Sequence, residues 1–380
     1  MSRRLFLTLF TILFAEAAMQ ASDEKVMRVY YGTKNQAGSK GIYTGTFNLE
    51  TGKLSEPQLA VEAENPGFVA ISHSGRFLYA VGSGKSGQRI VAYSIDRKSG
   101  KLTELNSQET GGANPCHVSV GPKDRYVVFA NYTGGSCGIM PLAEDGKLKP
   151  RSSFFKHSGS SGVNKARQEA PHPHSEHTEP SGRRVIVDAL GQDKVRVYRL
   201  GSDGKSMSPN DPATAKLPPG GGPRHVTFHA EGKWMYVNNE LTSSVTVFDV
   251  EKSSGAFKSK QTISTLPEKF SGSNTTAEVL VHPSGRFLYC SNRGHDSVAS
   301  FQIDQKTGEL TLIGITSSGG KTPRNFGITP EGGYLIVANQ DSDNVVVLKI
   351  DQKTGKLKPT GNRITLPHCI CVRFLKSSVE

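Results

Sequence analysis

Residues 276–308 read TAEVLVHPSGRFLYCSNRGHDSVASFQIDQKTG, and this segment is one unit of an internal repeat. It contains short apolar runs, among them Val279-Leu280-Val281 and Phe287-Leu288-Tyr289, which are separated by turn residues. Runs of this length that are rich in Val, Tyr and Phe and bounded by Gly, Pro, Asn and Asp are typical of β-strands. The unit ends on Thr307-Gly308, a pair that is typical of a hairpin turn.

A Thr, Ser or Asp followed by Gly recurs seven times along the chain, each time at the end of an apolar-alternating run. The intervals are 48, 46, 58, 51, 53 and 47 residues, and a period near fifty is typical of a propeller or solenoid. The seven pairs are Thr51-Gly52, Ser99-Gly100, Asp145-Gly146, Asp203-Gly204, Ser254-Gly255, Thr307-Gly308 and Thr354-Gly355. We therefore expect one structural unit to be used seven times.

A second set of marks runs in phase with the first and shows what each unit contains. In six units a proline or threonine lies nine residues before a Gly or Asp, with one apolar run between the marks and others after them. The marks are Pro66, Pro115, Pro173, Pro223, Thr276 and Pro323, followed by Gly75, Asp124, Gly182, Gly232, Gly285 and Gly332. Each unit has four runs, which predicts a four-stranded antiparallel sheet, the blade of a β-propeller.

The two ends of the chain each supply part of a seventh unit. Residues 26–33 resemble the second strand of a blade, and residues 367–374 resemble a first strand with its leading proline. Pairing the two would close the ring and remove its open sheet edges. The predicted fold is an all-β, seven-bladed β-propeller. Residues 22–380 should form a single domain, because no linker-like change of composition divides the repeats.

The N-terminus indicates export. Residues 2–4 are Ser-Arg-Arg, residues 5–15 form an apolar run too short to span a bilayer, and small residues at 15–17 and 19–21 offer cleavage sites. Residues 1–21 are therefore predicted to be the signal peptide of a periplasmic or secreted protein with no integral membrane span after cleavage. An uncleaved membrane anchor is the alternative.

Composition bears on the partners of the chain. The formal net charge is +12, yet no run of basic residues and no aromatic stacking pattern indicates a nucleic-acid partner.

The five cysteines lack metal-ligand spacing, and we interpret most of them as buried thiols rather than a disulfide framework. Residues 156–171, rich in Ser, Gly and Lys, lengthen one interval and are expected to form a surface loop. We expect a monomer.

Superposition of the repeats brings polar residues to two equivalent positions. The residue after the leading proline should begin the innermost strand, and the residue eight past the Gly or Asp mark should end the second strand. Antiparallel neighbours begin and end at one face, so both positions should open on one mouth of the channel. The residues that follow the first position in two blades, His117 and His225, should point the other way and pack through hydrogen bonds. The first position holds Gly67, Cys116, His174, Arg224, Ala277, Arg324 and, in the closing blade, His368; the second holds Ser83, Tyr132, Leu190, Glu240, Arg293 and Gln340.

The predicted catalytic set is His174, Arg224, Glu240 and Arg293. A Glu and a His close together can act as general base and acid, and two arginines can hold a carboxylate or phosphate and stabilise an oxyanion. For any one of these residues, a salt bridge between neighbouring blades is the structural alternative. Substrate-binding roles are predicted for further residues at or beside the same positions, namely Arg324, Asn239, Asn292, Gln340 and His368.

Residues 171–177, Pro-His-Pro-His-Ser-Glu-His, also resemble a metal site. His172, His174 and Glu176 would share one face of a strand, and His and carboxylate ligands suit zinc or another divalent ion. Two prolines interrupt regular strand geometry in this segment, however, and no other His-rich segment clearly completes a ligand shell. We therefore predict no metal and no other cofactor, with the metal site as the alternative.

At these residues the chain resembles the seven-bladed propeller lactonase family, which includes bacterial 6-phosphogluconolactonases and fungal carboxymuconate-lactonizing cyclases. In the cyclase branch a His, an Arg, a Glu and a second Arg form the proposed site, and matched residue by residue they fall on His174, Arg224, Glu240 and Arg293. The resemblance covers essentially all of the mature chain and is most specific in GGPRHV (221–226), VNNE (237–240), GRFLYCSNRGHDS (285–297), TPRNF (322–326) and ANQDS (338–342).

The predicted activity is hydrolysis of a small anionic sugar lactone such as 6-phosphogluconolactone, without a redox cofactor. Glu240 or His174 would activate water, the other would manage the proton of the ring oxygen, and the two arginines would hold the anion and the oxyanion. The alternatives are cyclisation of a muconate-type diacid and ligand or protein binding without turnover. Two features depart from the family: the expected export, and the charge of residues 173–180 where an apolar inner strand is expected.

Overall fold

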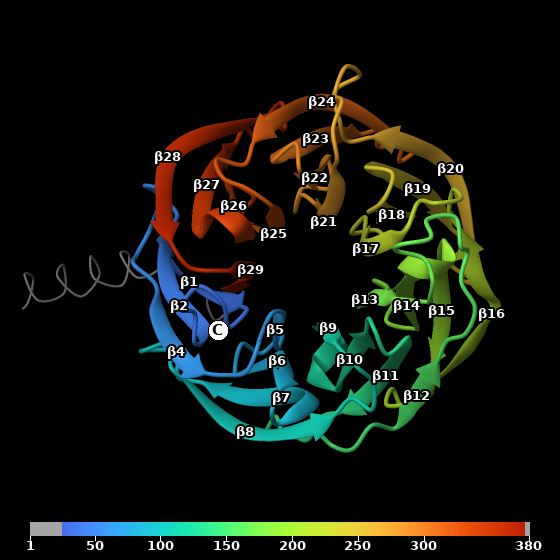
Figure 1. Cartoon of the computed structure of the whole chain (residues 1–380), viewed down its shortest axis with the longest axis horizontal. Coiled ribbons are helices and arrows are strands. Elements are labelled where there is room, and N and C mark those ends of the chain that lie inside the picture. The colour runs from blue at the N-terminus through green and yellow to red at the C-terminus, as the bar shows by residue number, and fades with distance from the viewer. Residues whose placement is uncertain (1–24, 377–380) are drawn as a thin grey trace, which may run out of the picture.

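The computed structural model describes residues 25–376, and these form seven antiparallel sheets arranged in a ring around a central channel (Figure 1). The predicted signal peptide lies outside the described residues. The predicted seven-bladed, all-β propeller is confirmed. The helices of residues 25–376 are three 3-10 turns of three residues each, η1 (Pro122–Asp124), η2 (Leu190–Gln192) and η3 (Gln340–Ser342), and none of them could cross a bilayer.

Six blades are each built from four consecutive strands, with the first strand nearest the channel (Figure 1). Their strands are β5 (Val69–Ile71), β6 (Phe77–Gly84), β7 (Gly87–Ile95) and β8 (Leu102–Glu109); β9 (Pro115–Val120), β10 (Tyr126–Asn131), β11 (Ser136–Pro141) and β12 (Ser153–Lys156); β13 (Pro173–Thr178), β14 (Arg184–Ala189), β15 (Lys194–Leu200) and β16 (Met207–Lys216); β17 (Pro223–Phe228), β18 (Trp234–Asn239), β19 (Ser244–Val250) and β20 (Phe257–Ser264); β21 (Thr275–Val281), β22 (Phe287–Arg293), β23 (Ser297–Ile303) and β24 (Leu310–Ser317); and β25 (Pro323–Ile328), β26 (Tyr334–Asn339), β27 (Asn344–Ile350) and β28 (Leu357–Thr365).

The seventh blade joins the two ends of the chain, as the sequence predicts. Its innermost strand is the C-terminal β29 (Cys369–Leu375), which pairs with the N-terminal β1 (Val26–Thr33). The outer part of the blade is β2 (Gly41–Asn48), which pairs with both β3 (Lys53–Leu54) and β4 (Gln58–Glu62). The red and blue ends of the chain therefore lie side by side in Figure 1 and close the ring.

One predicted equivalence in the closing blade is wrong by two residues. In the blade formed by β17–β20, Pro223 pairs with Asn239 and His225 pairs with Asn238, which leaves Arg224 in a bulge. In β29 the corresponding pairs are Cys369 with Thr33 and Cys371 with Gly32. The residue equivalent to Arg224 is therefore Ile370, not His368. His368 instead occupies the positive-φ position that precedes the strand, at φ 48°, so Pro367 is not equivalent to the leading prolines of the other blades.

The recurring glycine turns lie where one blade packs against its neighbour. Gly308, at φ 74°, faces the indole of Trp234 so closely that an added Cβ would lie 2.3 Å from Cδ2, and the carbonyl of Gly308 accepts a 3.0 Å hydrogen bond from the Tyr236 hydroxyl. Gly355 repeats the arrangement with Phe287 and Tyr289. Tyr30 and Tyr79 donate equivalent bonds to the glycines at 100 and 146. Glycine is thus required in these turns by both the backbone conformation and the neighbouring blade.

We predict that Gly308→Ala destabilises the propeller by about 2–5 kcal/mol, because a left-handed backbone costs about 1–2 kcal/mol and an overpacked interface about 1–3 kcal/mol. Urea unfolding followed by fluorescence measures the loss. Gly361→Ala is the matched control: Gly361 also has a positive φ, of 81°, but an added Cβ would meet no atom within 4 Å. Equal losses in the two variants would show that the contact between blades contributes nothing.

Candidate active site

A cavity of about 600 Å³ opens at the mouth of the channel where the first strands begin and the second strands end. The structure brings the predicted set His174, Arg224, Glu240 and Arg293 together in its wall, with Arg324 beside them. The two repeat positions therefore do open on one face, as expected. In addition to these five, the two positions contribute Gly67, Cys116, Ser83 and Tyr132 to the lining.

Glu240 is the centre of the site. It follows β18 directly, and its side chain is 1% exposed. Its Oε2 accepts a 2.9 Å hydrogen bond from Arg224 Nη1, while its Oε1 lies 2.6 Å from Arg167 Nη2 and 3.2 Å from Arg293 Nη2. Four segments of the chain thus bring three guanidinium groups onto one buried carboxylate.

The arginines determine the charge state of Glu240. Burial by itself would raise its pKa, but the positive charges of Arg293, Arg224 and Arg167 outweigh burial and hold the pKa well below the ordinary value of 4.5. Glu240 is therefore ionised at neutral pH. In return, the carboxylate raises the pKa of Arg167 against the effect of burial.

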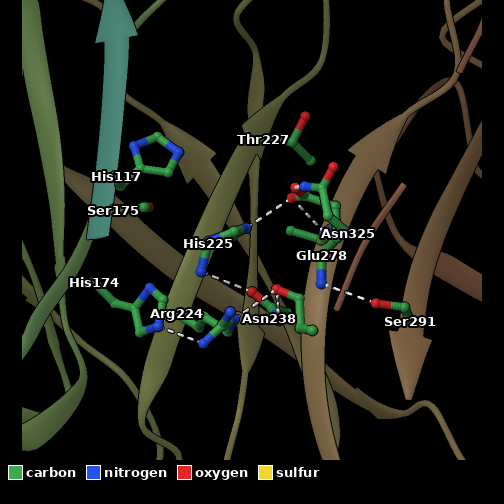
Figure 2. A network of polar contacts seen from close by, with 12 residues as sticks. His117, His174, Ser175, Arg224, His225, Thr227, Asn238, Glu278, Ser291 and Asn325 are labelled. Carbon is green, nitrogen blue, oxygen red and sulfur yellow. Dashed lines mark hydrogen bonds and ion pairs between the residues drawn. The ribbon is translucent and has the colours of Figure 1, made fainter. Parts of the chain in front are cut away.

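His174 is held neutral in the same cluster. Burial first, and then the positive charge of Arg224, lower the pKa of His174 well below 6.5. Its Nε2 accepts a hydrogen bond from Arg224 Nη1, so the ring proton is on Nδ1, which has no partner among residues 25–376. Figure 2 shows this contact between β13 and β17. His174 therefore orients Arg224 in this state.

Two residues of the site lie outside the predicted set. Arg167 belongs to the segment that was expected to be a surface loop, but its guanidinium reaches Glu240 and the Tyr132 hydroxyl, at 2.6 Å and 3.3 Å. Lys34 follows β1 in the closing blade and also lines the cavity. The backbone nitrogen of Lys34 donates to the carbonyl of His368, just as the backbone nitrogen of Glu240 donates to the carbonyl of Gly222. Lys34 therefore occupies the same repeat position as Glu240, and extending the repeat to the N-terminal strand would have identified it.

Four residues with predicted substrate-binding roles do not line the cavity. Asn239 and Asn292 precede the second site position, and because side chains alternate along a strand they point into the blade, where they bond Ser244 and Ser297. Gln340 begins η3 and its amide bonds Asp341. His368 lies two residues before the bulge position, as described above. We therefore assign none of these four to the cavity wall.

A second polar layer lies behind the site. His225 Nδ1 is 2.8 Å from Glu278 Oε1, and His117 Nδ1 is 3.0 Å from Glu176 Oε1. Both histidines are buried and hydrogen-bonded, as expected, and Figure 2 shows His225 turned away from its neighbour Arg224. These two contacts join neighbouring inner strands, β17 to β21 and β9 to β13.

The segment considered as a metal site does not converge on one point. His172 Nε2 lies 2.7 Å from Glu169 Oε1, the Nε2 of His174 faces Arg224, and Glu176 faces the second layer. A positive φ at His172 and a bulge between Pro173 and Ser175 break the alternation that the interpretation assumed. Within residues 25–376 no three potential ligands lie close enough together to hold a metal ion.

Comparison with known proteins identifies the family. The family described as "Lactonase, 7-bladed beta-propeller" matches residues 28–374. The chain belongs to this lactonase family. It is 36% identical over 346 residues to the 6-phosphogluconolactonase of Bacillus subtilis (strain 168), covering 91% of this chain and 97% of the relative. It is 34% identical over 291 residues to the 6-phosphogluconolactonase of Formosa agariphila, covering 74% and 80%.

Among solved structures, the lactonase chain is similar to the periplasmic gluconolactonase of Pseudomonas aeruginosa. The TM-score is 0.88 at 30% sequence identity, and the likeness covers 93% of this chain and 100% of the other. The scaffold is therefore shared over 93% of this chain with a protein titled a gluconolactonase.

We predict that Glu240→Gln costs about 3–5 kcal/mol of unfolding free energy at pH 7, because the guanidiniums lose their buried countercharge. A carboxyl group with a depressed folded-state pKa stabilises the fold above its unfolded pKa and loses that contribution as the pH falls through the folded-state pKa. The gap between the parent and the variant should therefore shrink as the pH drops from about 5 toward about 2. Urea unfolding across this range measures it.

Glu62→Gln is the control for the acid series, since Glu62 is an exposed carboxylate with no ion pair among the described residues. A gap for Glu240→Gln that stays constant with pH would contradict the depressed pKa.

Proposed function

We propose that the protein is a lactonase that opens a sugar lactone such as 6-phosphogluconolactone by hydrolysis. The observation that carries the proposal is the ionised Glu240 held among three guanidiniums in the wall of a cavity. Membership of the lactonase family and the names of the relatives support it. The proposed active site contains the four predicted catalytic residues, His174, Arg224, Glu240 and Arg293, together with Arg167.

The proposed reaction begins with attack of water on the lactone carbonyl carbon. Glu240 accepts a proton from the water as the C–O bond forms, and the carbonyl oxygen becomes an oxyanion. The tetrahedral intermediate then breaks the bond to the ring oxygen, which takes the proton from Glu240 and leaves as a hydroxyl group. The products are one hydroxy acid, which loses its carboxyl proton to solvent, and the regenerated carboxylate.

The arginine cluster explains how a weak base could serve this reaction. Proton transfer removes the negative charge of Glu240 at the moment when the oxyanion acquires one. Arg224 and Arg293 can then pass from one anion to the other, because Arg224 Nη2 and Arg293 Nη1 have no hydrogen-bond partner among residues 25–376. The net charge of the cluster stays constant, so the cost of charge movement in this buried site is small.

His174 has a positioning role in this mechanism rather than the acid–base role that was one of the sequence-based alternatives. Its neutral ring accepts a hydrogen bond from Arg224, whose Nε donates to the carbonyl of Ala277 at 3.0 Å. These two contacts fix the plane of the guanidinium toward Glu240.

We predict that Glu240→Gln lowers kcat/KM for lactone hydrolysis by at least about 10²-fold, the contribution usual for a general base. Arg224→Gln should cost about 10²–10³-fold through the oxyanion. Acid release on a lactone panel at constant pH, corrected for uncatalysed hydrolysis, measures both, with Glu62→Gln as the control. Folded Glu240→Gln protein that hydrolyses every lactone at the parental rate would sink the proposal. Turnover of a muconate-type diacid instead of lactones would favour the cyclase.

We also propose that the protein is exported, on the basis of its N-terminal sequence and its likeness to a protein titled periplasmic gluconolactonase. In a Gram-negative host the periplasmic fraction should contain a chain that begins at Ser22, as measured by intact mass. Deletion of residues 5–15 should leave the protein in the cytoplasm. Recovery of a full-length parent chain from the cytoplasmic fraction would contradict export.

A further inference from the structure

The cavity contains two cations that the Glu240 cluster does not use. Five cationic side chains line it, and three of them, Arg167, Arg224 and Arg293, contact Glu240. The other two are Lys34 and Arg324. Neither forms an ion pair or a side-chain hydrogen bond with any residue of the described range 25–376. They are therefore free to bind an anion from outside the chain.

Lys34 and Arg324 belong to neighbouring blades. Arg324 is the second residue of β25 and occupies the same bulge position as Arg224, while Lys34 follows β1 and occupies the same position as Glu240. At the bulge position of the closing blade, β29 contributes the apolar Ile370 to the wall. The next blade contributes Gly67, where an added Cβ would lie 2.8 Å from Ile370 Cδ1, so glycine keeps this part of the cavity open.

The electrostatics of this side of the cavity favour a bound anion. Burial first, and then the positive charges of Arg224 and Arg293, lower the pKa of Arg324 to about 9. Burial and the charge of Arg324 also lower the pKa of Lys34. Burial and the neighbouring cations thus outweigh the partial compensation that Glu240 gives Arg324, and neither cation has an ion-pair partner of its own among residues 25–376. An anion that enters the cavity relieves both costs at once.

We propose that Lys34 and Arg324 form a subsite for an anionic substituent of the lactone, a phosphate ester or a carboxylate, in the same cavity as the Glu240 cluster. This inference rests on the proposed lactonase function. A guanidinium can bind two oxygens of such a group, and a lysine ammonium supplies a further point charge. The Glu240 cluster acts on the ring carbonyl, and the cation pair selects the lactones that carry a charge. A cavity of about 600 Å³ has room for both ends of a hexose-sized substrate.

The test compares three lactones of one sugar series: 6-phosphogluconolactone, gluconolactone and a glucarolactone whose C6 is a carboxylate. The variants are Lys34→Gln, Arg324→Gln and the double variant, which remove charge and retain side-chain length. The specificity ratio, kcat/KM for a charged lactone over kcat/KM for gluconolactone, should fall at least tenfold in each single variant and further in the double variant. The loss should appear in KM. Arg324→Lys should restore part of it.

The two charged lactones distinguish the sources of the anion. A ratio that falls for the phosphorylated lactone identifies a phosphate subsite, and one that falls only for the glucarolactone identifies a carboxylate subsite. Lys353→Gln, an exposed hairpin lysine, is the matched control and should leave both ratios unchanged. Equal losses on all three lactones would overturn the inference, because the pair would then act on the ring. Unchanged ratios would overturn it as well.

Phosphate binding separates this inference from the proposed function. Isothermal titration of inorganic phosphate into the parent should give a binding signal that the double variant lacks. If the parent hydrolysed no lactone, the proposed function would fail, and the titration would still decide whether the cation pair binds an anion. Equal binding by parent and double variant would contradict the subsite.

Discussion

The packing of one blade against the next is the constraint on which the rest of the structure depends. At each of two interfaces a hairpin glycine faces an aromatic ring of the preceding blade at a distance that leaves no room for a side chain. A tyrosine hydroxyl from the same strand then binds the glycine carbonyl at 2.9–3.0 Å. These contacts join each blade to the next, and the packing of blades against one another positions the inner strands around the channel. The position of the inner strands in turn determines where the site residues lie at the mouth of the channel.

Charge is the second constraint, and it acts at that mouth. A buried carboxylate is unfavourable unless it is paired, and Glu240 is paired three times. The three arginines come from separate parts of the chain, and only Arg224 shares a blade with Glu240, so the packing of neighbouring blades assembles the cluster. Two further cations remain without a partner in residues 25–376. One carboxylate among five cationic side chains leaves the cavity electropositive, which suits a substrate that carries an anion as well as a reacting carbonyl.

Much of the fold and part of the site could be predicted from the repeat. The marks at fixed spacing predicted the blades and the ring closure, and they brought His174, Arg224, Glu240 and Arg293 to one mouth. The prediction was wrong where it depended on a single proline, because Pro367 precedes His368 without beginning the inner strand. It was wrong again at Asn239 and Asn292, where the alternation of side chains along a strand turns the neighbour of a site residue into the blade.

The repeat and its turn residues specified the architecture, since hydrophobic alternation and glycine turns are local properties that every blade expresses for itself. Only the tertiary structure could assign Arg167 and the N-terminal Lys34 to the cavity. Arg167 lies in a segment without periodicity, and nothing local indicates that its guanidinium reaches Glu240, 73 residues further along the chain. The charge state of Glu240 also depends on the tertiary structure, because its low pKa arises from arginines on three other segments of the chain. Local pattern determines strands, whereas long-range electrostatics between strands determines what the site can do.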